Sequence, residues 1–477
     1  MTTVALTEKP SIYHREEASV VIFPTQPYWF SATQEIEQIL DAFSLNKSEE
    51  IISKISETFC IKQEEAKETY LSIEELLYSS GVLIKNGQIL KPHEFSPDFQ
   101  VNDVENVMVI ATTQECNLSC PMCYAMASKK MFNEMNTQEI KSIVDQLVRM
   151  PWENRISRVA LTGGELFMRP DAIELIEYVH QQGFFVQVNT NATTLSTKQI
   201  KRLSALPQLK MSVSLDGCQA TSHEFIRGSG TFGITIDTIR SLCEQGVSVA
   251  INMFVHAGNL NEIKETLLLA DNLGVSGFNC LNMMNVGRGN SKKTKETLVG
   301  VSLKDFYRTV FEAIRYDVQL QKLMINSTFA NQIMGIAGGV KSHSCGIGTN
   351  RAVYVKADGT LYPCADTSLP AFCLGNLRED KLLDIWENST LLKNLRSLNI
   401  DNLNSRCSAC DVRYQCAGNC RGENYQTTGD IQSPHFKCEE IHDSILDLMW
   451  ILTEEPDFFK IKVDELYDKV STHASMA

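Results

Sequence analysis

The chain has 477 residues, of which 43% are hydrophobic and 21% charged, an ordinary composition for a soluble protein of two or three domains. Its formal net charge of −14 argues against a duplex nucleic-acid partner, which would bind a basic surface. The longest apolar runs are strand-sized and the first residues lack a basic-then-apolar signal region, so we expect a cytoplasmic protein with no membrane partner.

Residues 1–85 are predicted to form a small separate domain. Two β-rich pieces, 18–24 and 27–31, flank a turn that carries two prolines, and three amphipathic helix patterns follow and stop at Gly81. Residues 86–104 contain prolines and show little periodicity, which is typical of a linker.

Strand-like and helical patterns then alternate through a second predicted domain, 105–325. The strand-like runs are 106–112, 156–161, 184–189, 210–215, 247–254 and 276–282. Six such units in series predict an α/β fold in which a parallel sheet closes partly into a TIM-like (β/α)6 barrel. Chemistry in such barrels gathers at the C-terminal ends of the strands.

A cluster of thiols directly follows the first predicted strand. Cys116, Cys120 and Cys123 are spaced C-x3-C-x2-C, and Tyr124 comes next. A structural zinc site takes four protein ligands, whereas three thiols on a cubane iron–sulfur cluster leave one iron open to a substrate or cofactor. A partial zinc site and a redox loop are the alternatives that the motif alone leaves open.

This motif resembles that of the radical S-adenosylmethionine (SAM) superfamily, and matching segments follow the next three strands. They are 162-TGGE-165, 190-TNAT-193, 212-SVSLDG-217 and 223-HEFIRG-228. The resemblance implies a SAM-binding 4Fe-4S cluster on the three cysteines and SAM contacts from Tyr124, Gly163, Gly164, Glu165, Asn191, Ser214 and Arg227. The chain departs from the family pattern at Ala192, where glycine is usual, and at Glu224, where aspartate is commoner.

Seven further cysteines lie in the predicted third domain, 326–440, which a helical extension at 441–477 follows. Their intervals resemble the SPASM branch of the superfamily, which implies two auxiliary 4Fe-4S clusters. The outer cluster would take Cys407, Cys410, Cys416 and Cys438, and the inner cluster would take Cys345, Cys364 and Cys420. Cys373 is a candidate fourth inner ligand, although a lone cysteine is more often simply buried. One zinc site on Cys407, Cys410, Cys416 and Cys420 is the alternative.

The first domain resembles the winged-helix leader-recognition element of ribosomal-peptide (RiPP) maturases. The resemblance implies that a precursor peptide adds its leader as a strand to an open sheet edge, between Tyr28–Ser31 and Glu64–Tyr78. A generic DNA-binding winged helix is the alternative, and the richness of residues 33–80 in glutamate weakens it.

These features together predict a radical SAM oxidoreductase that forms thioether crosslinks in a precursor peptide, most like sactipeptide and ranthipeptide maturases. A flavodoxin or ferredoxin would supply electrons. The alternatives are carbon–carbon crosslinking or another radical modification of the peptide, sulfatase maturation to formylglycine, and an iron–sulfur redox protein. Sulfatase maturases carry an aspartate directly after the cysteine that matches Cys364. Here Ala365 intervenes and Asp366 comes one place late.

Overall fold

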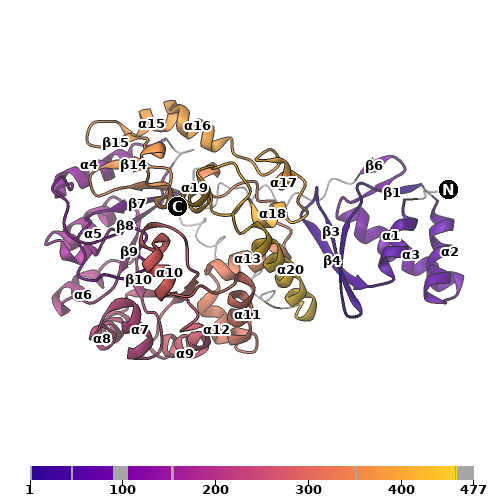
Figure 1. Cartoon of the computed structure of the whole chain (residues 1–477), viewed down its shortest axis with the longest axis horizontal. Coiled ribbons are helices and arrows are strands. Elements are labelled where there is room, and N and C mark those ends of the chain that lie inside the picture. Colours follow the sequence, from indigo (N-terminus) through magenta and orange to yellow (C-terminus); the bar gives the residue numbers. More distant parts are fainter. Residues whose placement is uncertain are drawn as a thin grey trace.

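The computed structural model describes residues 3–44, 47–89, 106–151, 155–349, 352–456 and 458. A small N-terminal domain lies at one end of a larger α/β body (Figure 1). Among the described helices, none is both long and apolar enough to cross a membrane.

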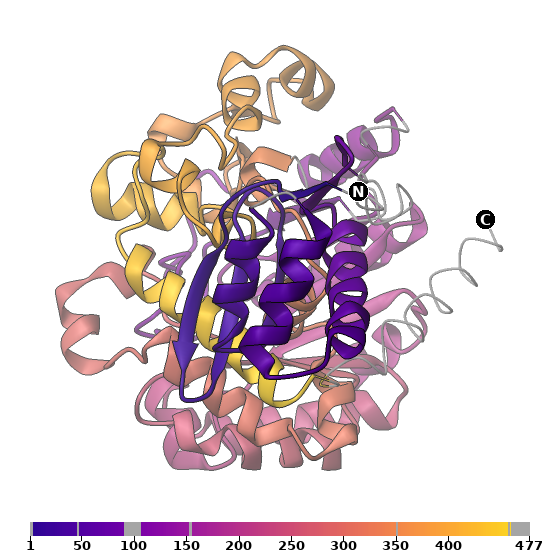
Figure 2. The same cartoon turned by 90° about the vertical axis from the view of Figure 1, so that its right-hand side faces the viewer.

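The N-terminal domain combines two small sheets with three helices. Its elements are β1 (Val4–Leu6), β2 (Ser11–Arg15), β3 (Ala18–Phe23), β4 (Tyr28–Thr33), α1 (Ile36–Ala42), α2 (Ser48–Phe59), α3 (Gln63–Ser79), β5 (Leu83–Lys85) and β6 (Gln88–Ile89). The strands of the main sheet lie in the order β2-β3-β4 and are antiparallel, and β1 pairs with the β5–β6 hairpin. Figure 2 shows the three helices side by side on the outer face of this domain.

The β5–β6 hairpin falls partly inside the segment predicted as a linker, 86–104. Its turn residues Asn86 and Gly87 have φ of 50° and 76°, the left-handed values that a two-residue hairpin turn requires. The predicted linker therefore begins within a hairpin, and its residues from 90 onward lie outside the described part of the chain.

Six parallel strands form the predicted partial barrel, which confirms the α/β fold. They are β7 (Val107–Ala111), β8 (Arg158–Thr162), β9 (Phe185–Thr190), β10 (Leu209–Ser214), β11 (Ser248–Phe254) and β12 (Gly277–Leu281). The strands pair in chain order from β7 to β12. Because β7 takes β13 (Ala352–Val355) as its second partner, the six strands do not close on themselves.

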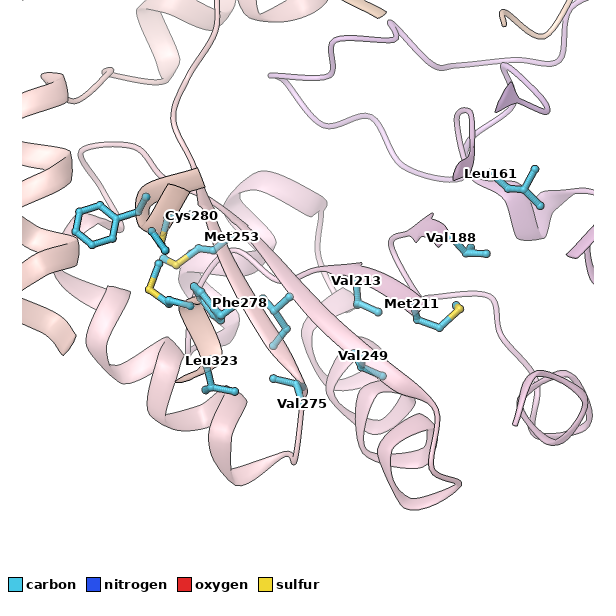
Figure 3. Packing of buried hydrophobic residues seen from close by; sticks show 14 of the residues in the cluster. Leu161, Val188, Met211, Val213, Val249, Met253, Val275, Phe278, Cys280 and Leu323 are labelled. Carbon is cyan, nitrogen blue, oxygen red and sulfur yellow. The ribbon is translucent and has the colours of Figure 1, made fainter. Parts of the chain in front are cut away.

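Helices cover the outer face of these strands and bury a continuous apolar core. They are α4 (Thr137–Val148), α5 (Ala172–Gln181), α6 (Thr197–Leu203), α7 (Ala220–Arg227), α8 (Thr231–Glu244) and α9 (Ile263–Asn272). Figure 3 shows Val188, Val213 and Val249 from neighbouring strands within that core, and each is at most 1% exposed. Burial of such side chains is the main stabilising contribution to the sheet.

The sheet continues from the barrel into the cysteine-rich region. Strand β13 pairs in parallel with β7, and β14 (Thr360–Tyr362) and β15 (Gly375–Asn376) extend the sheet antiparallel to nine strands. The remaining helices are α10 (Lys292–Thr297), α11 (Leu303–Ile314), α12 (Val318–Met324), α13 (Thr328–Ala337), α14 (Gly346–Thr349), α15 (Leu382–Asn388), α16 (Thr390–Arg396), α17 (Ser405–Ser408), α18 (Arg413–Cys416), α19 (Arg421–Thr428) and α20 (Cys438–Glu454). The predicted C-terminal extension is thus the second part of α20, and residues 459–477 lie outside the described part of the chain.

The N-terminal domain docks on the larger body through the β2-β3-β4 sheet, beside α13 and α20 (Figure 1). Val20 and Ile22 belong to the same buried cluster as the barrel strands. The Trp29 indole donates to the Ile336 carbonyl at 2.9 Å, and the Tyr13 hydroxyl donates to Asp411 Oδ2 at 2.6 Å. The sheet therefore lies between two cores, because Val20 and Ile22 on one face pack into the body, whereas Val21 and Phe23 on the other face pack into the core of the N-terminal domain.

Candidate active site and cluster centres

The three N-terminal cluster cysteines lie in a loop that folds back on itself after β7. The Cys116 N–H donates to the Ser128 carbonyl at 3.0 Å, and the Ser128 N–H donates to the Gln114 carbonyl at 3.0 Å. The pKa of Cys116 is raised to about 11, chiefly by burial, and the neighbouring thiols of Cys120 and Cys123 contribute to this rise. The loop therefore brings together the three thiols that the sequence predicts as cluster ligands.

The glycines of the TGGE segment allow β8 to press against this loop. A Cβ atom on Gly163 would lie 2.3 Å from the Thr113 carbonyl oxygen, and one on Gly164 would lie 2.1 Å from the Glu115 oxygen. The Gly164 N–H donates to Thr113 O at 2.8 Å. Only glycine permits this close backbone approach, which fixes the segment that leads into Cys116.

Glu165 is buried and joins the TGGE and TNAT segments. Its Oε1 accepts from Thr190 Oγ1 at 2.8 Å and from the Phe167 N–H at 3.2 Å, and its Oε2 accepts from the Asn191 N–H at 2.8 Å. Burial raises the pKa of Glu165, and these hydrogen bonds oppose the rise. The side chain thus holds two strand ends in register, and its contact with the SAM amine remains a prediction.

Asn191 ties the TNAT segment to the cysteine loop. Its Nδ2 donates to Asn117 Oδ1 at 3.0 Å, and the Asn117 amide donates to Thr193 Oγ1 at 2.8 Å. Sequence reasoning missed Asn117, although it lies between Cys116 and Cys120 inside the motif. Ala192, which stands where glycine is usual, is buried and has a φ of 59°.

Arg227 is paired with Asp216, a residue of the segment 212–217 to which the sequence analysis gave no role. Its Nε donates to Asp216 Oδ2 at 2.6 Å, and its Nη1 lies 3.7 Å from Cys120 Sγ. Asp216 is fully buried at the end of β10, two residues beyond Ser214. Glu224 points elsewhere, because it accepts from the Phe232 N–H near the start of α8 at 3.2 Å. The structure therefore brings Arg227, but not Glu224, to the cysteine loop.

The seven C-terminal cysteines separate into two groups. In the first group, Cys407, Cys410 and Cys438 each influence the pKa of Cys416, which burial raises to about 12. In the second group, Cys345 influences the pKa of Cys364, which burial raises to about 11, and both thiols influence Cys420. These groups match the outer and inner ligand sets that the SPASM resemblance implies, and ligation itself remains a prediction.

Asp366 lies beside the inner group. Its Oδ2 is 3.5 Å from Cys420 Sγ, and burial raises the pKa of its carboxyl. Cys373, the candidate fourth ligand, is exposed, and its Sγ lies 3.9 Å from the Gly375 carbonyl. The only sequence signal for Asp366 was its place next to the Cys364 segment.

Tyr124 connects the two cluster regions. Its side chain is 41% exposed, and burial raises the pKa of its hydroxyl to about 12. Both Cys123 and Asp366 act on its pKa. Tyr124 therefore lies between the N-terminal thiols and the inner C-terminal group.

The chemistry of these donor sets fits iron–sulfur clusters. All fifteen cysteines lie in the described part of the chain and carry free thiols, and ten of them fall into the three groups above. Clusters of soft thiolates select iron–sulfur centres or zinc, and a closed zinc site would need four ligands in each group. Two of the three groups hold three cysteines, which suits clusters with an open iron.

Comparisons with known proteins agree with this geometry. Residues 110–270 match the model of the radical SAM superfamily, and residues 345–411 match the iron–sulfur cluster-binding SPASM domain. The chain is 31% identical to the AdoMet-dependent heme synthase of Methanosarcina barkeri over 338 residues, which cover 67% of this chain and 91% of that protein. The chain belongs to the radical SAM superfamily. Its cofactors are accordingly SAM and 4Fe-4S clusters, with auxiliary clusters in the SPASM domain.

Two further proteins are similar to this radical SAM/SPASM protein, one in sequence and one in fold. The chain is 26% identical to the mycofactocin maturase MftC of Mycobacterium tuberculosis, with 69% of this chain and 82% of the relative covered. Its fold is similar to that of SuiB from Streptococcus suis bound to the precursor peptide SuiA. That match has a TM-score of 0.57 and 15% identity, and it covers 91% of this chain and 98% of the other.

Proposed function

We propose that this radical SAM/SPASM protein is a peptide maturase that installs intramolecular thioether crosslinks, from cysteine sulfur to carbon, in a ribosomally made precursor. Residues 1–85 would bind the leader, 105–325 would carry the SAM chemistry, and 326–440 would hold the auxiliary clusters. The observation that carries the proposal is a sheet edge in the N-terminal domain, on a domain that is docked against the catalytic body.

That edge is strand β4. Among the described strands, β4 pairs only with β3, so its other side offers backbone donors and acceptors to an added strand. Helix α3 lies beside the start of β4, because the Tyr28 hydroxyl contacts Ser80 and burial raises the pKa of Tyr28. Leu76 of α3 is 46% exposed and offers an apolar contact to a bound peptide.

The comparisons support a peptide substrate. Residues 86–477 make up about four-fifths of the chain, so a match that covers 91% of it must include part of the N-terminal domain. SuiB was solved with a precursor peptide bound, and MftC is named as a maturase. A leader held on β4 would raise the local concentration of the attached core peptide near the barrel.

The protein residues at the strand ends would bind and orient the reactants. SAM and its reduced cluster, when bound, supply a radical that removes a hydrogen atom from an unactivated carbon. Arg227, fixed by Asp216, would hold the SAM carboxylate beside Cys120. The inner thiols Cys345, Cys364 and Cys420 leave a ligand position that a substrate thiolate would fill. Each link would remove two hydrogens, one as the abstracted atom and the other as the thiol proton together with one electron, which the auxiliary clusters would accept. A flavodoxin or ferredoxin would reduce the SAM cluster.

Mass spectrometry of a precursor peptide tests this proposal. A short cysteine-containing peptide encoded next to this gene would be co-expressed anaerobically with the protein, then reduced and alkylated. Loss of two hydrogens per link, with the linked cysteines no longer alkylated, is the expected result. The same loss with every cysteine alkylated would favour carbon–carbon crosslinking. An unchanged peptide, despite SAM cleavage, would contradict the proposal for that peptide. The Cys123→Ala variant is the inactive control.

A further inference from the structure

Two lysine-rich segments lie against the cysteine loop. One is 128-SKK-130, directly after the loop, and the other is 291-SKKTK-295, at the start of α10. Lys129, Lys130, Lys292, Lys293 and Lys295 are all exposed, and we call these five residues the lysine collar. The two segments lie more than 160 residues apart in the chain, and the fold brings each of them into contact with the cysteine loop.

The first segment is fixed directly to the cluster loop. Ser128 exchanges backbone hydrogen bonds with Gln114 and Cys116, so Lys129 is one residue away from a hydrogen-bond partner of Cys116. Arg288 adds a second link, because its Nε donates to Cys120 O at 2.9 Å and its Nη1 donates to Ala127 O at 2.7 Å.

The second segment is fixed to the opposite part of the same loop. The Thr294 hydroxyl donates to the Pro121 carbonyl at 2.9 Å, and the Arg288 N–H donates to the Cys123 carbonyl at 3.0 Å. Gly287 approaches so closely that a Cβ atom there would lie 2.2 Å from the Tyr124 carbonyl oxygen. Helix α10 therefore sits on the loop that carries the three thiols.

The charge of this surface is opposite to that of the protein. The whole chain has a formal charge of −14, whereas the collar adds five positive charges around one loop. Lys292 has one weak acidic neighbour, Glu296 at 3.8 Å, and its side chain is 91% exposed. Glu134, the acidic residue nearest in sequence to Lys130, turns inward and accepts from the Gln114 N–H at 2.8 Å.

We propose that the lysine collar docks a small acidic protein that carries a one-electron flavin or iron–sulfur centre. The carrier would lose one electron and the cluster on Cys116, Cys120 and Cys123 would gain it, with no bond made or broken. The net charge of −14 repels an acidic carrier, whereas the collar attracts it locally, which raises its encounter rate there. Phe132, fully exposed two residues beyond Lys130, supplies an apolar contact. The inference rests on the proposed need for a reductant, and it is independent of the peptide product.

Stopped-flow reduction of the reconstituted holoenzyme tests the collar. A recombinant flavodoxin, reduced beforehand, would be mixed with wild-type protein and with a Lys129→Glu, Lys130→Glu, Lys292→Glu, Lys293→Glu variant. We expect the second-order rate constant at low ionic strength to fall about tenfold or more, and its dependence on salt to weaken. The flavodoxin Kd, measured by thermophoresis, should rise in parallel.

Two controls make the result decisive. Photoreduced 5-deazariboflavin, a neutral small reductant, should reduce both proteins at similar rates and should still support peptide modification, which tests the proposed function separately. Lys198→Glu with Lys201→Glu, on exposed positions of α6, tests whether any added negative charge slows the carrier. The inference would be overturned if flavodoxin reduced the collar variant at the wild-type rate, or if deazaflavin reduced the collar variant as slowly as flavodoxin does. It would also be overturned if the α6 variant lowered the flavodoxin rate constant by the same factor per charge changed.

Discussion

Asp216 and Arg227 form a buried ion pair that orients a cation toward the cluster loop. The carboxylate Oδ2 lies 2.6 Å from the guanidinium Nε, and the guanidinium Nη1 lies 3.7 Å from Cys120 Sγ. The Asp216 side chain is fully buried, so the pair is held in a low-dielectric environment.

Replacing Asp216 with asparagine should destabilise the protein and weaken SAM binding. Removing one partner of a buried pair leaves an uncompensated charge, which costs about 3–5 kcal/mol. The measurements are urea unfolding and calorimetric titration with SAM. The Asp237→Asn variant removes an exposed pair with Arg240 and should change neither quantity. An Asp216→Asn protein that binds SAM as wild type would contradict the positioning role.

Substitutions at Ala192 would measure how much backbone strain at this position affects the free energy of unfolding. Its φ of 59° strains the folded state by about 1–2 kcal/mol, and glycine would relieve this strain. Glycine would also remove a buried methyl group that stabilises the fold by about 0.8 kcal/mol, and it would increase the conformational freedom of the unfolded chain. Ala192→Gly should therefore change the free energy of unfolding by less than about 1 kcal/mol. Ala192→Val should destabilise by more than about 2 kcal/mol, since a β-branched residue strongly disfavours this conformation. Similar losses in both variants would mean that packing decides.

The contact between Tyr13 and Asp411 should keep the N-terminal domain in one cooperative unit with the body. Although burial opposes it, hydrogen bonds from His442 and Tyr13 lower the pKa of Asp411 to about 2. Tyr13→Phe leaves this carboxylate one donor short, at a cost of about 1–3 kcal/mol. Calorimetry should then show an earlier transition for the N-terminal domain. Tyr178→Phe, which loses a hydrogen bond to Asp145 on the barrel, serves as the control.

Two cysteine variants should separate the cluster regions. Cys123→Ala removes one of three ligands and should abolish SAM cleavage, measured as 5′-deoxyadenosine. Cys438→Ala removes one outer thiol and should lower the iron content while sparing SAM cleavage more than crosslink formation. Equal loss of SAM cleavage in both variants would indicate that the C-terminal cysteines act on the fold of the whole protein.

His223 should make the protein sensitive to mild acid. Burial lowers its pKa from 6.5 to about 4, and its Nδ1 accepts the Asp216 N–H at 3.2 Å. Between pH 6.5 and 4 the unfolded chain binds a proton that the folded chain does not, so stability falls as pH falls, by about 3 kcal/mol for this group. His223→Asn, which keeps an acceptor, should flatten the pH profile of unfolding. A steep profile in His223→Asn would assign the effect elsewhere.

The barrel was predictable because short strand-like runs alternate with helical patterns along the chain, which is typical of successive βα units. Strand β2 was missed, since its sequence SIYHR is largely polar and its burial comes from docking on the body. The cysteine groups followed from spacing: the first motif comes directly after β7, whereas the C-terminal cysteines lie mostly in or beside short helices and were grouped by their intervals alone. Asp216 and Asn117 stood inside quoted motifs, yet their roles depend on partners that only the fold supplies.

The pairing of β7 with β13 has a consequence for how the protein is made. Val107 meets Ala352 across this pair, so the first barrel strand waits for about half of the chain to be synthesised before its second edge is covered. Until then β7 exposes unpaired backbone N–H and C=O groups along one edge, and these groups can pair with another nascent chain. A truncated protein that ends before residue 352 should therefore aggregate, even though it retains all six barrel strands and the SAM-cluster cysteines. Synthesis of the C-terminal cysteine domain thus completes the fold of the domain that precedes it.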